Sequence, residues 1–405
     1  MNRMPKFALI ALSLAIAHTG FAANANLQNY LFLACGSASG LLAQRCGLTD
    51  NGAGDVSGDS ESSLNPNQGL SVNDAALDSI RGQSTLYNSN DGASIGLLEM
   101  EIGPFGGFLN LKAGRLESDR RVDIEREREY AADSFGFDIG VDYQMQRESY
   151  IGVVLGYETY SLNFVADRSG ENFNPEGNAG GIDTESISGM LFAHLEIGSG
   201  VFAIANAGYA RQSMDIERMA IFQENNRQLS QLAVRTIADT DGTAQWLTLG
   251  VGYRLALGGW QISPGASWNL AQNNIDGYTE TDLNASGLNM RISDSERDSS
   301  IGEVGVKVSR EINTAGVVFN PQFRLSYERE LGRDPDNLTA KYVLDESDNR
   351  MVLRNDNIDE SQIVSAASLS LVAPNGWLSF FDAAMIWEND FYSGWRLTAG
   401  IRKKI

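Results

Sequence analysis

The stretch Trp395–Ile405 reads WRLTAGIRKKI, and it contains the pattern that much of the chain repeats. Trp395 and Leu397 fall on one parity, whereas Arg396 and Arg402 fall on the other. Successive side chains of a β-strand point to opposite faces, so this stretch predicts a strand with one apolar and one polar face. A soluble sheet can alternate in the same way, so the choice between the two depends on the other segments.

Eleven earlier segments repeat the alternation, beginning at Phe105. The expected strands span residues 105–116, 134–144, 150–162, 184–197, 201–213, 246–257, 260–270, 302–308, 319–328, 362–372, 377–387 and 395–405.

The connections between these segments alternate in length. Short ones, such as Gly258–Gly259, alternate with long ones at 117–133, 163–183, 214–241, 271–299 and 329–361. Outer-membrane barrels combine short periplasmic turns with long outer loops, and lipid offers no hydrogen bonds to an open sheet edge. We therefore expect an all-β fold, a transmembrane antiparallel twelve-stranded β-barrel over residues 93–405, with both ends of the strand array on the periplasmic side.

A soluble β-sandwich is the alternative fold, and it would bury its apolar face against a second sheet. It would not need a second face as rich in Gly, Asp and Arg as the one seen here. Aromatic residues near the expected strand ends also suit the two interfaces of a membrane. These residues are Tyr143, Tyr157, Tyr253, Trp260, Tyr327, Trp377 and Trp395.

The composition excludes two further classes. The chain of 405 residues has no apolar run of the ~20 residues that a membrane helix needs, which excludes a helical membrane protein. Its formal net charge is −21 at pH 7. Binding to phosphate backbones requires a basic face, so we expect no nucleic-acid partner.

Charged residues on the polar parity predict the lining of the barrel lumen. An Arg or Lys facing lipid at mid-membrane costs about 2–4 kcal/mol, so these side chains should point inward. Both signs occur, which indicates a polar, partly ion-paired interior rather than an open, ion-selective pore. The predicted lumen-lining residues are Asp138, Asp142, Glu196, Arg254, Glu303, Lys307, Arg324, Glu328, Arg396 and Arg402.

The N-terminus has the pattern of a secretory signal peptide over residues 1–22. Two basic residues, Arg3 and Lys6, precede a short apolar core, and small residues follow it. Residues 23–92 would then form a short N-terminal passenger or linker segment. Export to an oxidising compartment favours a disulfide between Cys35 and Cys46, with two free thiols as the alternative.

Within this segment, Ser71–Asn88 has apolar residues near helical spacing and an acidic residue, Asp74, in the expected first turn. A twelve-stranded barrel is wide enough to hold one helix but too wide to be filled by side chains alone. We expect this segment to enter the barrel from the periplasmic side and plug it. A disordered periplasmic tail is the alternative.

We expect no catalytic, cofactor-binding or metal site. Gly58-Asp59-Ser60 matches the start of a Gly-Asp-Ser-Leu esterase motif, but Glu61 follows and the sequence has no Asp-x-x-His partner. Asp239-Thr240-Asp241-Gly242 lacks the later ligands of a calcium loop, so it predicts a turn into the sixth strand. His194 is expected in the lumen. The acidic stretch Asp345–Glu360 is expected to be a solvated loop, with divalent cation binding as the alternative.

Five stretches together carry a resemblance to a known family. They are FGFDIGVDY at 135–143, DTDGT at 239–243, GGWQISPGASW at 258–268, IDGYTE at 275–280 and LTAGIR at 397–402. In this order and spacing they resemble the C-terminal translocator barrel of classical autotransporters, the type V secretion family, over residues 100–405. The resemblance implies a twelve-stranded outer-membrane barrel whose lumen holds a helical segment leading to an exported passenger.

The resemblance also implies partners. The barrel would be embedded in outer-membrane lipid. It would be assembled with help from periplasmic chaperones by the outer-membrane insertion machinery, which recognises the last strand. We expect a monomer without cofactors. The expected function is to anchor or display the chain's own short N-terminal segment at the cell surface and to present long extracellular loops, without enzymatic activity. The alternatives are an adhesin-like or structural barrel that acts through its loops, and a surface esterase.

Overall fold

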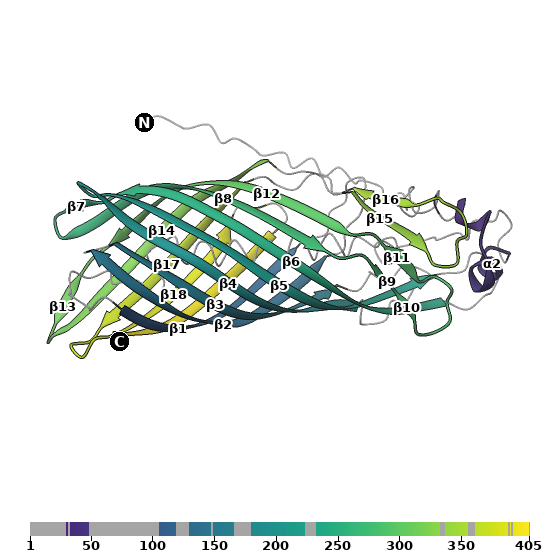
Figure 1. Cartoon of the computed structure of the whole chain (residues 1–405), viewed down its shortest axis with the longest axis horizontal. Helices are drawn as coiled ribbons and strands as arrows, with labels where there is room; N and C mark the ends of the chain where they lie inside the picture. The colour runs from purple at the N-terminus through teal and green to yellow at the C-terminus, as the bar shows by residue number, and fades with distance from the viewer. Residues whose placement is uncertain are drawn as a thin grey trace, which may run out of the picture.

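A computed structural model gives the architecture of the chain (Figure 1). The structure describes Tyr30 and residues 33–47, 105–118, 129–146, 149–165, 180–222, 232–332, 337–354, 361–387, 389 and 392–404. The predicted signal peptide at 1–22, the tripeptide at 58–60 and the predicted lumen helix at 71–88 lie outside these described residues.

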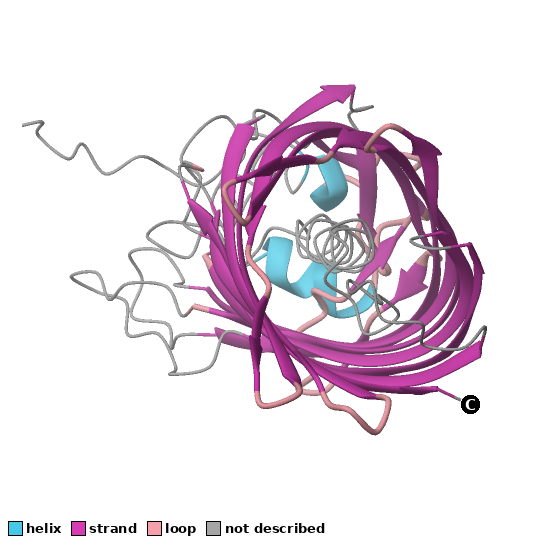
Figure 2. Cartoon of the chain, turned by 90° about the vertical axis from the view of Figure 1, so that its left-hand side faces the viewer, coloured by secondary structure: helices cyan, strands magenta, loops and turns pink. Residues whose placement is uncertain are grey.

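Twelve antiparallel strands form a closed barrel, which confirms the predicted fold class. Each strand pairs with the next along the chain, and the first strand pairs with the last, so the sheet has no open edge in the membrane. The barrel strands are β1 (Phe105–Ser118), β2 (Tyr130–Gln146), β3 (Ser149–Phe164), β4 (Gly180–Gly198), β5 (Val201–Phe222), β6 (Leu232–Tyr253), β8 (Trp260–Ile275), β12 (Ser295–Ser309), β14 (Val317–Gly332), β17 (Ser361–Val372), β18 (Trp377–Trp387) and β19 (Tyr392–Lys404). Viewed from the end with the short turns, they form a ring (Figure 2).

The two ends of the barrel differ. At one end, tight turns join neighbouring strands, and Ser199 and Gly200 both have positive φ values, 55° and 82°, as a two-residue hairpin turn requires. Short strands β7 (Leu255–Leu257) and β13 (Ile312–Thr314) extend two of these hairpins. Short turns mark the periplasmic end of an outer-membrane barrel, so the opposite end is the outer one.

The long connections at the outer end form a second, smaller sheet. Its strand order is β16-β15-β11-β9, and it is built from β9 (Tyr278–Thr279), β11 (Met290–Ile292), β15 (Asn337–Tyr342) and β16 (Met351–Arg354). A further short strand, β10 (Thr281–Asp282), pairs with β6 and ties this region to the barrel wall. Figure 1 shows these strands beyond the barrel, on the side opposite the C-terminus.

The outer ends of several strands are longer than the sequence predicted. The register of β5 and β6 continues to Phe222↔Leu232, so most of the predicted loop at 214–241 is strand. The predicted turn at Asp239–Gly242 was therefore wrong, because these residues lie inside β6.

A reversal of polarity along β6 explains this error. In β6, Leu249 is exposed at membrane height, whereas further out Asp239 is exposed and Ala238 and Val234 are buried. Above the membrane, β6 places apolar residues such as Val234 and Ala238 inside and charges such as Arg235 and Asp239 outside, as a soluble barrel does. The period of two continues, but the apolar face changes sides.

Inside the membrane portion, large inward-facing rings cover glycines on neighbouring strands. Trp246 lies directly over Gly208, where an added Cβ would collide with the indole ring. Phe380 covers Gly400 in the same way. The glycines thus leave room for aromatic rings to lie flat against the inner wall, and the close approach requires the missing side chain.

Candidate functional site

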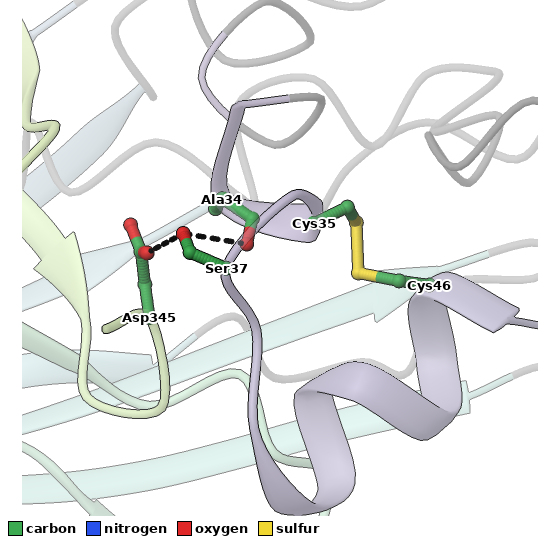
Figure 3. Close-up of a disulfide and its surroundings, with 5 residues drawn as sticks. All are labelled: Ala34, Cys35, Ser37, Cys46 and Asp345. Atoms are coloured by element: carbon green, nitrogen blue, oxygen red, sulfur yellow. Dashed lines mark hydrogen bonds between the residues drawn. A yellow bond between two sulfur atoms is a disulfide. The ribbon is translucent and has the colours of Figure 1, made fainter. Parts of the chain in front are cut away.

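The outer mouth of the barrel carries the N-terminal part of the described chain. We call Tyr30 and residues 33–47 the N-terminal hairpin. It consists of a helical turn at 33–35, a loop, and helix α2 (Gly40–Gly47). Cys35 and Cys46 are joined in a disulfide, with their Cα atoms 5.5 Å apart (Figure 3). Figure 1 places α2 beyond the outer end of the strands, and Figure 2 places it within the outline of the ring, so it lies over the mouth.

The loop inside the disulfide ring binds the turn after β15 through backbone hydrogen bonds. Ala38 and Asp345 form an antiparallel β-bridge. The Ser39 amide donates to the Leu344 carbonyl over 2.9 Å, and the Glu346 amide donates to the Ser37 carbonyl over 3.1 Å. The hairpin therefore extends the turn after β15 by one β-bridge, in the manner of β-strand addition.

Asp345 is the polar centre of this contact. Its carboxylate accepts hydrogen bonds from the Ser37 hydroxyl at 2.7 Å, the Tyr30 hydroxyl at 3.2 Å and the Ser347 amide at 2.9 Å. Burial would raise the pKa of Asp345, but the hydrogen bonds from Ser37 and Ser347 outweigh it and hold the pKa below its ordinary value. Asp345 is 3% exposed, so its predicted place in a solvated loop was wrong.

Tyr30 connects the hairpin to β15 by two contacts. Its ring stacks on Tyr342 with a centroid distance of 5.6 Å. Its hydroxyl oxygen accepts a hydrogen bond from the Tyr342 amide over 2.9 Å. Burial raises the pKa of Tyr30, so its hydroxyl stays protonated and can donate to Asp345.

Apolar packing continues from the hairpin into the barrel. We call this cluster the outer core. It joins the hairpin, the loop strands and the outer ends of the barrel strands, and its buried members are Tyr30, Ala34, Leu42, Cys46, Leu116, Tyr130, Ala132, Leu162, Phe164, Ile182, Met214, Ile216, Val234, Ala238, Ile275, Tyr278, Leu288, Met290, Ile292, Leu338, Ala340, Tyr342 and Met351. Residues from distant parts of the sequence thus share one core across the outer mouth.

A buried ion pair holds the loop between β8 and β12 against the wall. Arg218 of β5 donates from Nε and Nη2 to the two carboxylate oxygens of Glu280, over 2.6 and 2.5 Å. Arg218 also donates to the Leu288 carbonyl, and the Met290 amide donates to Glu280. Both side chains are almost completely buried, so each charge depends on the other.

The ten residues predicted to line the lumen all lie on the less exposed face of their strands. Asp138, Asp142, Lys307, Glu328 and Arg402 are buried, whereas Glu196, Arg254, Glu303, Arg324 and Arg396 are half-buried.

Several of these ten residues form ion pairs. Arg402 and Asp142 form two hydrogen bonds of 2.9 and 2.6 Å between the last strand and the second. Lys112, which the prediction omitted, contacts Asp138 at 2.9 Å and Glu158 at 3.7 Å. These ion pairs join strands that are adjacent in the sheet, as Lys112 and Asp138 do, or that are separated by one strand, as Arg402 and Asp142 are.

His194 lies on the same face, and its ring is stacked between two aromatic rings. Its ring lies 5.2 Å from Tyr150 and 5.1 Å from Phe202, nearly parallel to both. Arg254 reaches His194 over 2.9 Å and Glu196 over 3.0 Å. Cross-strand packing accounts for the position of the ring.

Comparison with known families identifies the barrel. The family model for the autotransporter β-domain matches residues 114–384. This chain belongs to the autotransporter family. It is an outer-membrane protein, and the matched domain is a translocator barrel, a transport unit rather than a catalytic one.

One solved autotransporter structure agrees in fold, and a second is reported beside it. The translocator domain of NalP from Neisseria meningitidis superposes with a TM-score of 0.59 at 13% identity, covering 82% of this chain and 98% of that one. The β-domain of the Bordetella autotransporter BrkA gives a TM-score of 0.48 at 16% identity, covering 75% and 100%. No curated protein gives a significant match to the sequence.

The site of this autotransporter includes residues whose contacts the sequence alone did not predict. Tyr30, Ser37, Arg218, Glu280 and Asp345 make its decisive polar contacts, and they are far apart in sequence. One signal was present in the sequence. A charged side chain such as Arg218 or Glu280 that points inward costs free energy unless it has a partner of opposite charge. The partners themselves depend on tertiary structure.

The described residues carry no metal cluster and no membrane-spanning helix. No group of three or more His, Cys, Asp or Glu side chains among them has an arrangement suited to a metal ion. No helix in the described part of the chain is long and apolar enough to cross a membrane.

Proposed function

We propose that this autotransporter barrel carries its own N-terminal hairpin to the cell surface and keeps it there, docked on the loops that close the outer mouth. The observation that carries the proposal is the contact of Ser37 and Tyr30 with Asp345, a loop residue more than three hundred positions away. The disulfide supports it, because the cross-link restricts the loop that makes these bonds.

The path of the chain supports export through the lumen. The hairpin ends at Gly47 beside the outer mouth, whereas β1 begins at Phe105, whose neighbour Gly106 pairs with Lys404 at the periplasmic end. The intervening residues must join the two ends. A path through lipid would leave backbone groups without hydrogen-bond partners, so we place it in the lumen.

A polar lumen suits this path. We propose that Asp138, Arg324 and the other charged residues predicted from parity line it, and that Ser71–Asn88 occupies it as a helix. The side-chain amide of Gln322 is buried without a partner among the described residues, and Asn320 and Ser326 on the same strand each have a buried oxygen in the same state. Such groups favour a polar occupant.

Assembly and surface roles complete the proposal. We propose that β19 is the strand recognised by the outer-membrane insertion machinery, with periplasmic chaperones delivering the unfolded chain.

The loops that hold the hairpin could also act as an adhesive surface, and the exposed side chains of Leu33 and Leu41 on the hairpin favour this second role. The sequence motif at Ser60 does not enter the proposal.

A short epitope tag placed before Tyr30 tests the display of the hairpin. On intact cells, an antibody should bind this tag, because the hairpin lies outside the membrane. The matched control is the same tag in the periplasmic turn at Asn375, which should be detected only after permeabilisation. Detection of both tags only after permeabilisation would contradict the proposal.

A further inference from the structure

Two tryptophans at the periplasmic end of the barrel each carry a cation over the ring. The Nζ atom of Lys403 lies 4.7 Å from the ring centroid of Trp377, and the Cζ atom of Arg310 lies 5.3 Å from that of Trp260. Each pair joins neighbouring strands, β19 with β18 and the end of β12 with β8. The two pairs therefore repeat one arrangement at separate places on the barrel.

Both pairs are on the outward face. Lys403 has the parity of Ile401, which is exposed, whereas Arg402 between them is buried and bonded to Asp142. Trp377 and Trp260 are 38% and 45% exposed. On this face, inside the membrane, the neighbouring side chains contact lipid, so the two cations stand on the lipid side of the wall.

Their height matches the headgroups of the inner leaflet. Lys403 is the penultimate residue of β19, and Arg310 directly follows the last residue of β12, so each cation lies beyond apolar outward residues such as Val308 and Ile401. Tryptophan rings favour the boundary between hydrocarbon and headgroups, and long basic side chains extend from there toward the polar side.

Neither cation forms an ion pair with any residue that the structure describes. The outer rim differs, since Arg115 pairs with Glu117 and Asp133 there, and Arg235 pairs with Glu217. An unneutralised cation at the height of the headgroups attracts an anion, and the anion at that height is a lipid phosphate.

We propose that Trp377–Lys403 and Trp260–Arg310 are two binding sites for the phosphate groups of anionic phospholipids in the inner leaflet. The indole supplies an apolar surface for the glycerol and upper acyl region, and the cation neutralises the phosphate. The acidic row Asp183, Asp215 and Asp239, paired across neighbouring strands on the outer rim, offers no such site. The barrel wall thus distinguishes the two leaflets by charge.

Native mass spectrometry of the full-length protein with phosphatidylglycerol tests the proposal. The variants are Lys403→Gln, Arg310→Gln and the double variant, and the matched control is Arg235→Gln on the outer rim. Each basic residue near a membrane surface contributes enough for a roughly fivefold change in lipid affinity. We expect about that loss for each single variant, a larger loss for the double variant and no change for the control.

Two further arms make the outcome decisive. Phosphatidylcholine should bind equally to the protein and to the double variant. Free glycerol phosphate should not displace phosphatidylglycerol, because the indole ring contacts the apolar part of the lipid. A heat-modifiability gel shows that each variant is folded. Equal binding of phosphatidylglycerol to the folded double variant would overturn the proposal, as would a similar loss for Arg235→Gln. Displacement by glycerol phosphate would reassign the sites to free phosphate esters.

Discussion

The hydroxyl of Ser37 donates a hydrogen bond of 2.7 Å to the carboxylate of Asp345, across a separation of 308 residues. This bond joins the N-terminal hairpin to the turn that follows β15. A hydrogen bond to a charged acceptor contributes about 1.5–3 kcal/mol, more than a neutral one. The contact is therefore a suitable point at which to separate the hairpin from the barrel without changing the wall.

Asp345→Asn should weaken the docked hairpin by about 1.5–3 kcal/mol, because the carboxylate accepts several hydrogen bonds that an amide cannot all accept. Hydrogen exchange of the amides at 37–39 should become faster. Asp348→Asn, an exposed change three residues further on, is the control. Equal exchange in the two variants would show that Asp345 does not hold the hairpin.

Docking should also depend on pH. The pKa of Asp345 is lower in the docked state than in the free chain, so the charged form favours docking. The contribution is fully present above the ordinary carboxyl pKa of about 3.9 and is lost as pH falls through the lowered value. Protease digestion of the hairpin should increase only in that acidic range. In Asp345→Asn, this acid-induced increase should be absent.

Reduction of Cys35–Cys46 should loosen the hairpin but leave the barrel closed. A disulfide closing a short loop stabilises by about 2–4 kcal/mol, chiefly by restricting the undocked state. A Cys35→Ser and Cys46→Ser variant should lose protection at 37–39 while keeping its heat-modifiable migration. Unchanged protection after reduction would mean that the outer core alone determines the conformation.

Much of the barrel could be predicted from sequence, and the mouth could not. Period-two alternation located all twelve strands because lipid requires one apolar face, and closure followed from the same requirement. The outer extension of β5 and β6 was missed because the apolar parity changes sides above the membrane, as Leu249 and Val234 show. The role of Asp345 was missed because its partners, Ser37 and Tyr30, are brought to it only by the fold.

Gly208→Val should impair formation of the barrel, because an added Cβ would collide with the Trp246 ring on the neighbouring strand. Overpacking of this kind costs about 1–3 kcal/mol or more. Gly189→Val is the matched control, since a Cβ there meets only the end of the Leu155 side chain at 3.8 Å. The fraction of heat-modifiable protein in membranes should fall for the first variant and not for the second.

Arg218→Met should unfold the loop between β8 and β12, because it leaves the Glu280 carboxylate buried without its partner. Removing one member of a buried pair costs about 3–5 kcal/mol. The double variant Arg218→Met with Glu280→Leu should recover most of this loss. Protease sensitivity at 276–294 should be highest in the single variant and lower in the double variant. A double variant as sensitive as the single one would show that the two charges do more than neutralise each other.

Photo-crosslinking in intact cells tests the docked hairpin most directly. Leu41 lies against Gly287, whose added Cβ would be 2.7 Å from the Leu41 Cβ atom. A photoreactive phenylalanine analogue at position 41 should crosslink, within the same chain, to a peptide containing 286–289, and the Asp345→Asn change should reduce the yield. Crosslinks from position 41 to the periplasmic turns, or to other proteins with none to 286–289, would contradict a hairpin docked over the outer mouth.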